Sequence, residues 1–275
     1  MPSLALANAS AGVGLGNAHA RNQIRAAASW GCDRGQISSK LFELFVQLQE
    51  LPEMKDSTSA RITVLISGGG TNLQALIDAC GTDDLPNAKI VGVISDRKDA
   101  YGLTRAKTAS IPTTHHGILR YKREHPDSSP EPKFDQARRA YDADLAKLVL
   151  EDEPDLVVCA GFMRILTTAF LDPVKAATVP IINLHPAKPG ELVGAKCIDD
   201  AWDEFKAGKR TETGIMIHYV IEEVDMGAPI VSTNIDITGC ETLKNLETRI
   251  HASEHPLIVK GAKTAIEKLR NERKV

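Results

Sequence analysis

Short runs of apolar, mostly β-branched residues alternate along this chain with segments of helical periodicity. The apolar runs lie at 62–66, 89–95, 111–115, 155–160 and 179–185. Helical patterns lie at about 72–80, 100–109 and 134–150. An alternation of strand and helix in this order predicts a parallel, doubly wound sheet with helices packed against it. The chain is therefore expected to have an α/β fold.

The last part of the sequence departs from this alternation. Two β-prone runs, 213–224 and 230–237, are separated only by the turn Asp225-Met226-Gly227-Ala228-Pro229. Strands joined by so short a turn must be antiparallel. The sheet is therefore predicted to be mostly parallel, with an antiparallel C-terminal hairpin. A long helix over about 241–270 follows, and Pro256 is its candidate break point.

The first 60 residues differ in composition from the rest of the chain. Residues 1–32 contain no Asp or Glu and are rich in Ala, Ser, Gly and Asn. This composition predicts an N-terminal extension over 1–60 that is mostly disordered, followed by the folded domain at 61–275. Apolar residues at helical spacing predict one amphipathic helix at 38–51. A mitochondrial transit peptide over 1–32 is the alternative, because such peptides are poor in acidic residues and carry Arg.

Charge and cysteine content exclude several classes of protein. The net charge is −3, which gives no electrostatic footprint for nucleic acid. No apolar run approaches the roughly 20 residues that a membrane helix needs. The five cysteines are odd in number and form no C-x-x-C pair, which disfavours a disulfide scaffold or a structural zinc site. A reducing compartment fits this pattern, and we expect the protein to be cytoplasmic.

The stretch Val179–Gly190 carries the most informative polar residues. Side chains two apart in a strand share a face, so Asn183 and His185 are expected to project together. Pro186 ends the ladder and places the pair at the carboxyl end of the strand, which borders the ligand crevice in open α/β sheets. An amide and an imidazole there can both donate hydrogen bonds to a developing oxyanion. The alternative is a strand end at which both residues only cap and turn.

A glycine turn follows the first predicted strand. Ser67-Gly68-Gly69-Gly70-Thr71-Asn72 leads into a helix, and a helix N-terminus with free backbone N–H groups binds anions. The turn is neither a Walker loop nor a G-x-G-x-x-G motif. Thr71 and Asn72 either donate to a phosphate or merely cap the helix.

Two further segments are candidates for binding. Arg138, on the helix predicted at 134–150, is either solvated or grips a phosphate. The apolar loop 161–166 is either core or one wall of a pocket for a flat aromatic ligand. Residues 117–133 lie between the third predicted strand and the helix at 134–150. They contain three prolines and are predicted to form a loop or surface insertion.

Six segments, in order, resemble the phosphoribosylglycinamide formyltransferase family over residues 61–270. They are ISGGGTNLQALIDA (66–79), FDQARRAYDADL (134–145), AGFMRIL (160–166), INLHP (182–186), TGIMIHYVIEEVDMGAPI (213–230) and IHASEHPLIV (250–259). The resemblance implies a formyltransferase-type Rossmann-like fold. It also implies transfer of the formyl group of 10-formyltetrahydrofolate to the amine of glycinamide ribonucleotide in purine biosynthesis, with no metal.

The resemblance also implies roles for individual residues. The catalytic residues would be Asn183, His185 and Asp225, with His218 in a supporting position beside them. The ribonucleotide phosphate and amine would be bound by Gly70, Thr71, Asn72, Arg138 and Glu254. The folate would contact Met163, Arg164, Ile165, Leu166 and the backbone at Val224. A carboxylate beside an imidazole favours the charged ring, which is the form that donates to an oxyanion.

The sequence departs from the bacterial pattern directly after INLHP. It reads Ala187-Lys188-Pro189-Gly190 where the bacterial form has Ser-Leu-Leu-Pro, so Lys188 is expected to bring a new charge near the folate tail. Alternatives within the same chemistry are a 10-formyltetrahydrofolate hydrolase and a methionyl-tRNA formyltransferase. A non-catalytic folate- or phosphate-binding subunit is the alternative from another class. We expect a monofunctional protein that is a monomer or a weak homodimer.

Overall fold

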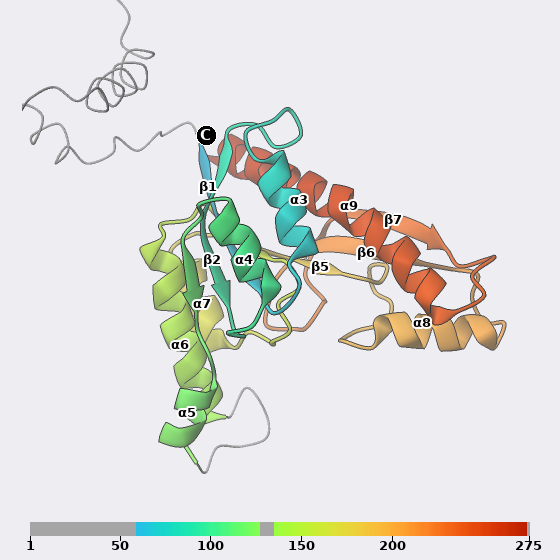
Figure 1. Cartoon of the computed structure of the whole chain (residues 1–275), viewed down its shortest axis with the longest axis horizontal. Coiled ribbons are helices and arrows are strands. Elements are labelled where there is room, and N and C mark those ends of the chain that lie inside the picture. Colours follow the sequence, from blue (N-terminus) through green and yellow to red (C-terminus); the bar gives the residue numbers. More distant parts are fainter. Residues whose placement is uncertain (1–58, 127–134, 274–275) are drawn as a thin grey trace, which may run out of the picture. The chain divides into compact units, whose positions relative to one another are not determined.

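The computed structural model describes residues 59–126 and 135–273, which belong to one compact unit, Ser57–Val275 (Figure 1). The predicted extension over 1–60, with its helix at 38–51, lies outside the described residues apart from residues 59 and 60. Residues 127–133 of the predicted insertion at 117–133 also lie outside them. Within the described part of the chain, strands and helices alternate as predicted.

A single mixed sheet forms the centre of the domain. Its strands are β1 (Ala60–Ile66), β2 (Ala88–Ser95), β3 (Thr113–His115), β4 (Leu156–Cys159), β5 (Ile181–His185), β6 (Glu212–Tyr219) and β7 (Pro229–Asp236). Their order across the sheet is β3-β2-β1-β4-β5-β6-β7. The strands from β3 to β5 are parallel, and β6 and β7 are antiparallel to their neighbours. The predicted mixed α/β sheet is confirmed.

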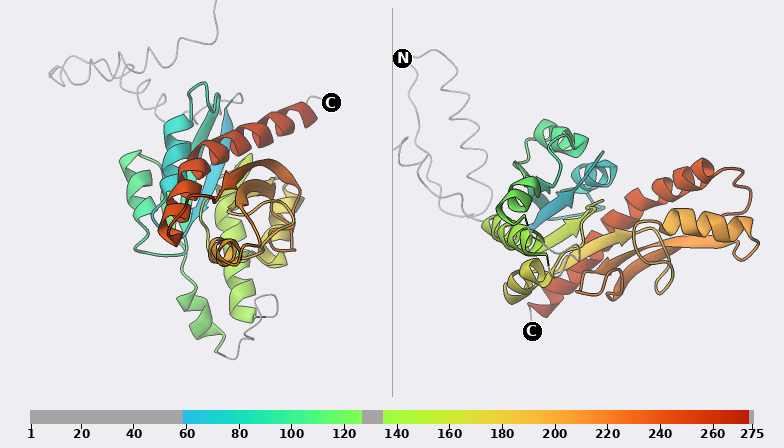
Figure 2. Two further views of the ribbon diagram at one scale, coloured as in Figure 1. Left: turned by 90° about the vertical axis from the view of Figure 1, so that its right-hand side faces the viewer. Right: turned by 90° about the horizontal axis from the view of Figure 1, so that it is seen from below.

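Helices cover both faces of this sheet (Figures 1 and 2). Those on one face are α3 (Thr71–Ala79), α4 (Tyr101–Thr108), α8 (Cys197–Lys206) and α9 (Leu243–Glu272). Those on the other are α5 (Leu119–Glu124), α6 (Gln136–Glu151) and α7 (Thr168–Ala176). The two faces have separate apolar cores because side chains alternate along each strand. In β1, for example, Ile62, Val64 and Ile66 join the first core and Leu65 joins the second.

The structure corrects four details of the sequence reading. Helix α7 lies in a segment for which no helix was predicted, and α5 lies within the predicted 117–133 loop. Strand β6 ends at Tyr219, so the connection to β7 is longer than the predicted five-residue turn. Helix α9 runs unbroken through Pro256. An interior proline costs a helix about 3 kcal/mol, and burial of Leu257, Ile258 and their neighbours against the sheet offsets that cost.

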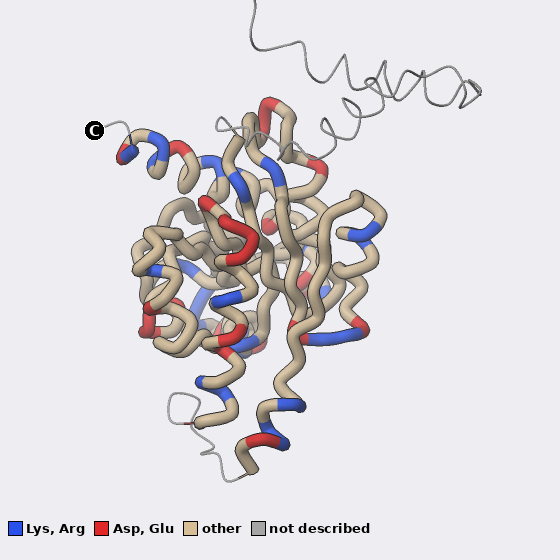
Figure 3. The backbone as a smooth tube through the Cα atoms, turned by 90° about the vertical axis from the view of Figure 1, so that its left-hand side faces the viewer, with Lys and Arg blue, Asp and Glu red and all other residues tan. Residues whose placement is uncertain are grey.

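Basic and acidic segments are interspersed on the side of the domain seen in Figure 3. None of the helices in the described residues is long and apolar enough to cross a membrane.

Helix α9 can approach β6 closely because Gly261 has no side chain. A Cβ atom at this position would lie 2.7 Å from Cγ2 of Ile217 in β6. Gly261→Ala should therefore lower the free energy of unfolding by about 1–3 kcal/mol through overpacking, although Ala favours a helix more than Gly does. Urea unfolding measures the change. Lys260→Ala, at the exposed neighbouring position, is the control, and a stabilised Gly261→Ala variant would contradict the close packing.

Candidate active site

Four polar side chains converge near the carboxyl end of β5. Asn183 and His185 share one face of β5, as the period of a strand requires. His218 lies opposite Asn183 in the antiparallel register of β5 with β6. Asp225 reaches the same point from the loop between β6 and β7. The predicted catalytic residues therefore come together, although they are up to about forty residues apart in sequence.

The carboxylate of Asp225 lies between the two imidazole rings. Its Oδ2 is 3.4 Å from Nδ1 of His185, and its Oδ1 is 3.6 Å from Nε2 of His218. The backbone N–H of Gly194 donates to Oδ2 at 3.0 Å. Asp225 adopts φ 57°, a left-handed conformation uncommon for residues other than glycine. Such strained positions cluster at functional sites, which argues that this residue is more than part of a turn.

These neighbours lower the pKa of Asp225. Burial by itself would raise it, but the His218 hydrogen bond, the charge of His185 and the Gly194 N–H outweigh burial. The pKa of this carboxyl therefore lies below the usual value for Asp. A negative charge is thus stabilised directly beside the imidazole of His185.

Both ring nitrogens of His185 face oxygen acceptors. Nδ1 faces Asp225, and Nε2 lies 2.7 Å from the carbonyl oxygen of Leu192. The side chain is only 4% exposed. Two acceptors suit a ring that carries protons on both nitrogens, because each N–H then has a partner.

His218 lies between Asn183 and Asp225. Its Nδ1 donates to the carbonyl oxygen of Tyr219 at 2.9 Å. Its Nε2 lies 3.3 Å from Nδ2 of Asn183 and 3.6 Å from Oδ1 of Asp225. His218 is 2% exposed.

Residues 188–194, which include Leu192 and Gly194, are joined by ion pairs to Arg210 and to Glu212 at the start of β6. Lys188 contacts Glu212, and Arg210 contacts Glu191 at 3.0 Å. Lys188 does not line the pocket described next. Its charge is paired with Glu212, and its expected position near a folate tail stays a prediction.

A pocket of about 350 Å³ opens beside these residues. One wall is the loop 161–166, and the other is formed by Val220, Ile221, Glu222 and Val224. Asn183, His185, His218 and Asp225 lie between the walls. Met163 and Ile165 are 68% and 50% exposed, so the wall presents apolar side chains that the fold itself leaves uncovered. All the residues predicted to contact folate line this pocket: Met163, Arg164, Ile165, Leu166 and Val224.

Arg138 lies behind the loop and not at the glycine turn. Its guanidinium donates to the carbonyl oxygen of Ile165 and to the buried carboxylate of Asp142. The structure thus places the guanidinium of Arg138 against the 161–166 wall, and its contact with a phosphate stays a prediction. Sequence reasoning missed Asp142, whose helical spacing from Arg138, four residues, was the available signal.

The glycine turn lies at the N-terminus of α3, where Gly70 caps the helix with φ 70°. A Cβ atom there would lie 2.6 Å from the Cα of Gly102, so only glycine fits. Nδ2 of Asn72 donates to Oε2 of Glu254 in α9 at 3.0 Å. Oδ1 of Asn72 is buried and has no hydrogen-bond partner among the described residues. Thr71 is exposed, and none of Gly70, Thr71, Asn72 and Glu254 lines the 350 Å³ pocket.

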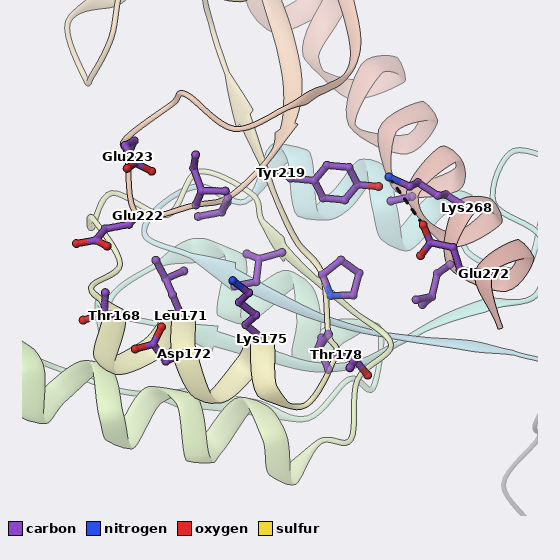
Figure 4. Close-up of a pocket in the computed structure, with 17 residues that line it drawn as sticks. Thr168, Leu171, Asp172, Lys175, Thr178, Tyr219, Glu222, Glu223, Lys268 and Glu272 are labelled. Carbon is purple, nitrogen blue, oxygen red and sulfur yellow. Dashed lines mark ion pairs between the residues drawn. The ribbon is translucent and has the colours of Figure 1, made fainter.

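A larger hollow of about 620 Å³ lies elsewhere, between α7, the 219–223 segment and the end of α9 (Figure 4). Lys175 and Lys268 stand among Asp172, Glu222 and Glu272 on an apolar floor. These mixed charges define no single class of ligand. None of the residues predicted to be functional lines this hollow, but Val220, Ile221 and Glu222 line both cavities, so the hollow adjoins the 350 Å³ pocket.

No group of three or more His, Cys, Asp and Glu side chains in the described residues could hold a metal ion. An amide, an imidazole and a carboxylate at one end of a pocket can stabilise an oxyanion and move protons.

Comparison with known proteins defines the class. The formyl transferase family model matches residues 60–261, which include the whole sheet and every residue of the candidate site. The phosphoribosylglycinamide formyltransferase of Schizosaccharomyces pombe is 45% identical over 203 residues, covering 74% of this chain and 95% of the relative. The Saccharomyces cerevisiae enzyme of the same name is also 45% identical and is covered to 99% of its length, by 76% of this chain.

A solved structure agrees with the sequence relatives. Glycinamide ribonucleotide transformylase 1 from Symbiobacterium toebii superposes with a TM-score of 0.64 at 32% identity, covering 75% of this chain and 87% of that one. The chain belongs to the phosphoribosylglycinamide formyltransferase family. Members of this family take their formyl group from a folate-derived co-substrate.

The lowered pKa of Asp225 predicts how stability depends on pH. A carboxyl with a depressed folded-state pKa stabilises the fold above its unfolded pKa, about 3.9, and this contribution disappears as the pH falls through the folded value. Asp225→Asn removes the titration. The unfolding free energy of wild type minus that of the variant should therefore shrink between about pH 6 and about pH 3.

Urea unfolding at each pH measures this difference. Asp172→Asn, an exposed carboxylate outside the site, is the matched control for loss of one negative charge. A difference for Asp225→Asn that stayed constant or grew toward low pH would contradict the direction of the pKa shift.

Proposed function

We propose that residues 61–275 form a catalytic domain that transfers the formyl group of 10-formyltetrahydrofolate to the amine of glycinamide ribonucleotide. The observation that carries this proposal is the contact of Asp225 with His185 beside Asn183, at one end of an apolar-walled pocket. The named activities of the 45% identical relatives support the choice of substrates.

In the proposed reaction the amine nitrogen attacks the formyl carbon. The carbonyl electron pair moves to oxygen, and the tetrahedral oxyanion accepts hydrogen bonds from Asn183 and His185. When the intermediate collapses, the bond from the formyl carbon to N10 of the folate breaks. Tetrahydrofolate leaves with a proton on N10, and the former amine has lost one. The step therefore needs proton transfer but no net oxidant or reductant.

His185 must exchange a partner for this to happen. Its Nε2 lies 2.7 Å from the carbonyl oxygen of Leu192, and its Nδ1 faces the charged Asp225. The neutral carbonyl is the weaker of the two acceptors, because hydrogen bonds to charged groups are about twice as strong. The formyl oxygen therefore takes the place of Leu192. Asp225 holds the ring in orientation and accepts or relays the amine proton, through water where direct contact is not possible.

The ribonucleotide is assigned to the glycine turn and α9. The backbone N–H groups at Gly70, Thr71 and Asn72 begin a helix and suit a phosphate. The carboxylate of Glu254 and the unpartnered Oδ1 of Asn72 are neighbouring buried acceptors, and an ammonium or amine supplies the donor that Oδ1 lacks. We assign Arg138 to the folate side and not to the ribonucleotide, because its guanidinium contacts the wall loop at Ile165.

The folate is assigned to the pocket between loop 161–166 and Val224. A flat ring fits a site with one apolar wall and backbone groups on the other. The exposed Met163 and Ile165 would be covered by the ligand, which accounts for their exposure in the free domain.

We further propose that the protein lies in the cytoplasm, which microscopy of a fluorescent fusion would check. Sedimentation velocity would decide between a monomer and a weak homodimer. Deletion of residues 1–58 should leave activity intact if the catalytic domain begins near residue 60.

Absorbance at the wavelength of folate deformylation tests the activity directly. The purified protein should turn over 10-formyltetrahydrofolate only when glycinamide ribonucleotide is present. Asn183→Ala and His185→Ala should each lower kcat by about 10²–10³-fold, because each removes an oxyanion donor. Asp225→Asn should also lower kcat, because the proton acceptor beside His185 is lost.

Lys175→Ala, in the 620 Å³ hollow and outside the lining of the 350 Å³ pocket, is the control and should leave turnover unchanged. Turnover without the ribonucleotide would identify a hydrolase instead. Absence of turnover with ribonucleotide binding intact would identify a binding protein and refute the proposed reaction.

A further inference from the structure

Burial of its own side chains holds only part of the pocket wall at 161–167. Phe162 and Leu166 are buried in the second core, but Met163 and Ile165 are 68% and 50% exposed. The exposed part of the loop is fastened through its backbone and its one charge. The N–H of Met163 donates to Oγ of Ser67 at 2.8 Å, and Arg164 pairs with Asp96 at 2.7 Å. These contacts hold the first half of the loop.

The second half of the loop depends on α6. The carbonyl oxygen of Ile165 accepts from the guanidinium of Arg138. The backbone N–H of Thr167 donates to Oδ2 of Asp142 at 2.8 Å. Arg138 and Asp142 lie one helical turn apart on α6. One face of this helix therefore hydrogen-bonds the loop backbone on both sides of Leu166.

Asp142 is the residue on which both contacts rely. Its side chain is fully buried, and the Arg138 side chain is 9% exposed. Both carboxylate oxygens lie 3.3 Å from Nε of Arg138. A buried guanidinium needs a compensating charge, and Asp142 supplies it. Asp142 itself does not line the pocket, so it touches no ligand there.

We propose that Asp142 is a positioning residue for the formyl donor, which holds Arg138 and the Thr167 N–H so that loop 161–167 keeps the shape that receives the folate ring. This inference rests on the proposed function, because it assigns the ring to that wall. It goes beyond the proposed function by naming a residue that no ligand contacts. It predicts an effect on one substrate and not on the other, since the ribonucleotide site lies at α3 and α9.

Asp142→Asn is the variant that tests it. Asn keeps the size of the side chain and can still accept from Thr167, but it cannot neutralise Arg138. The KM for 10-formyltetrahydrofolate should rise about tenfold, while kcat and the KM for the ribonucleotide stay within about twofold. Titration calorimetry with tetrahydrofolate, the deformylated product, should show the same loss of affinity without any turnover.

Asp144→Asn is the matched control, since it makes the same change two residues along the same helix, where Asp144 bonds Tyr121 and Lys147. It should leave both KM values unchanged. Arg138→Gln/Asp142→Asn removes both charges, so it leaves no uncompensated charge if the single variant fails to fold. The double variant should still bind tetrahydrofolate weakly, because the contact with Ile165 is missing.

The outcomes separate the inference from the function it rests on. Absence of ribonucleotide-dependent turnover in the wild type would refute the function, and tetrahydrofolate titration would still decide the role of Asp142. Equal changes in both KM values, or unchanged folate affinity in Asp142→Asn, would overturn the inference. Wild-type folate affinity in the double variant would also overturn it, because charge compensation alone would then explain Asp142.

Discussion

A largely enclosed carboxylate, with its side chain only 10% exposed, lies between two imidazole rings and organises the chemistry of this domain. Asp225 contacts His185 from β5 and His218 from β6, and it receives the backbone N–H of Gly194. A buried charge is tolerated only when it is paired and hydrogen-bonded. The loop after β6 and the segment after β5 must therefore fold onto the same point. One charge thus fixes two loops and the orientation of both histidines.

The sheet divides the two proposed substrates between its faces. The strand order reverses between β1 and β4, and in open α/β sheets ligands bind outside the carboxyl ends of the strands at such a point. The glycine turn and Glu254 belong to the face covered by α3 and α9, whereas the folate wall is held by α6 on the other. Asn183 and His185 stand at the end of β5 between them. Substrates from both faces can meet there without sharing a pocket.

Local pattern in the sequence predicts the strands better than it predicts their ends. The sequence predicted that Asn183 and His185 share a face, because side chains alternate between the two faces of a strand. Residues 220–224 belong to the run predicted as a strand, yet they form part of the loop before Asp225, because pairing with β5 and β7 ends first. Helix α7 contains Pro173 and was missed, since its stability comes from burying Phe170, Leu171 and Val174. Tertiary burial of this kind leaves little local signal.

Side-chain direction at the site was less predictable than residue identity. Lys188 and Arg138 were expected to face ligands, but each is drawn to a protein partner that lies far away in sequence, Glu212 for one and the carbonyl of Ile165 for the other. Long cationic side chains reach several positions, so the nearest acceptor in the fold decides between them. Asn183 and His185 have short side chains and few rotamers. Their direction follows from the strand alone, and sequence reasoning succeeded for that reason.

The contact between His185 and Leu192 gives the proposed reaction a way to discriminate in favour of its transition state. In the free domain the imidazole already has a carbonyl partner at 2.7 Å. A formyl oxygen in the ground state is another neutral acceptor, so replacing Leu192 with it gains little. Once negative charge develops on that oxygen, the hydrogen bond becomes charge-assisted and about twice as strong. The exchange therefore becomes favourable only as the reaction proceeds, and interactions that strengthen in the transition state are those that raise kcat.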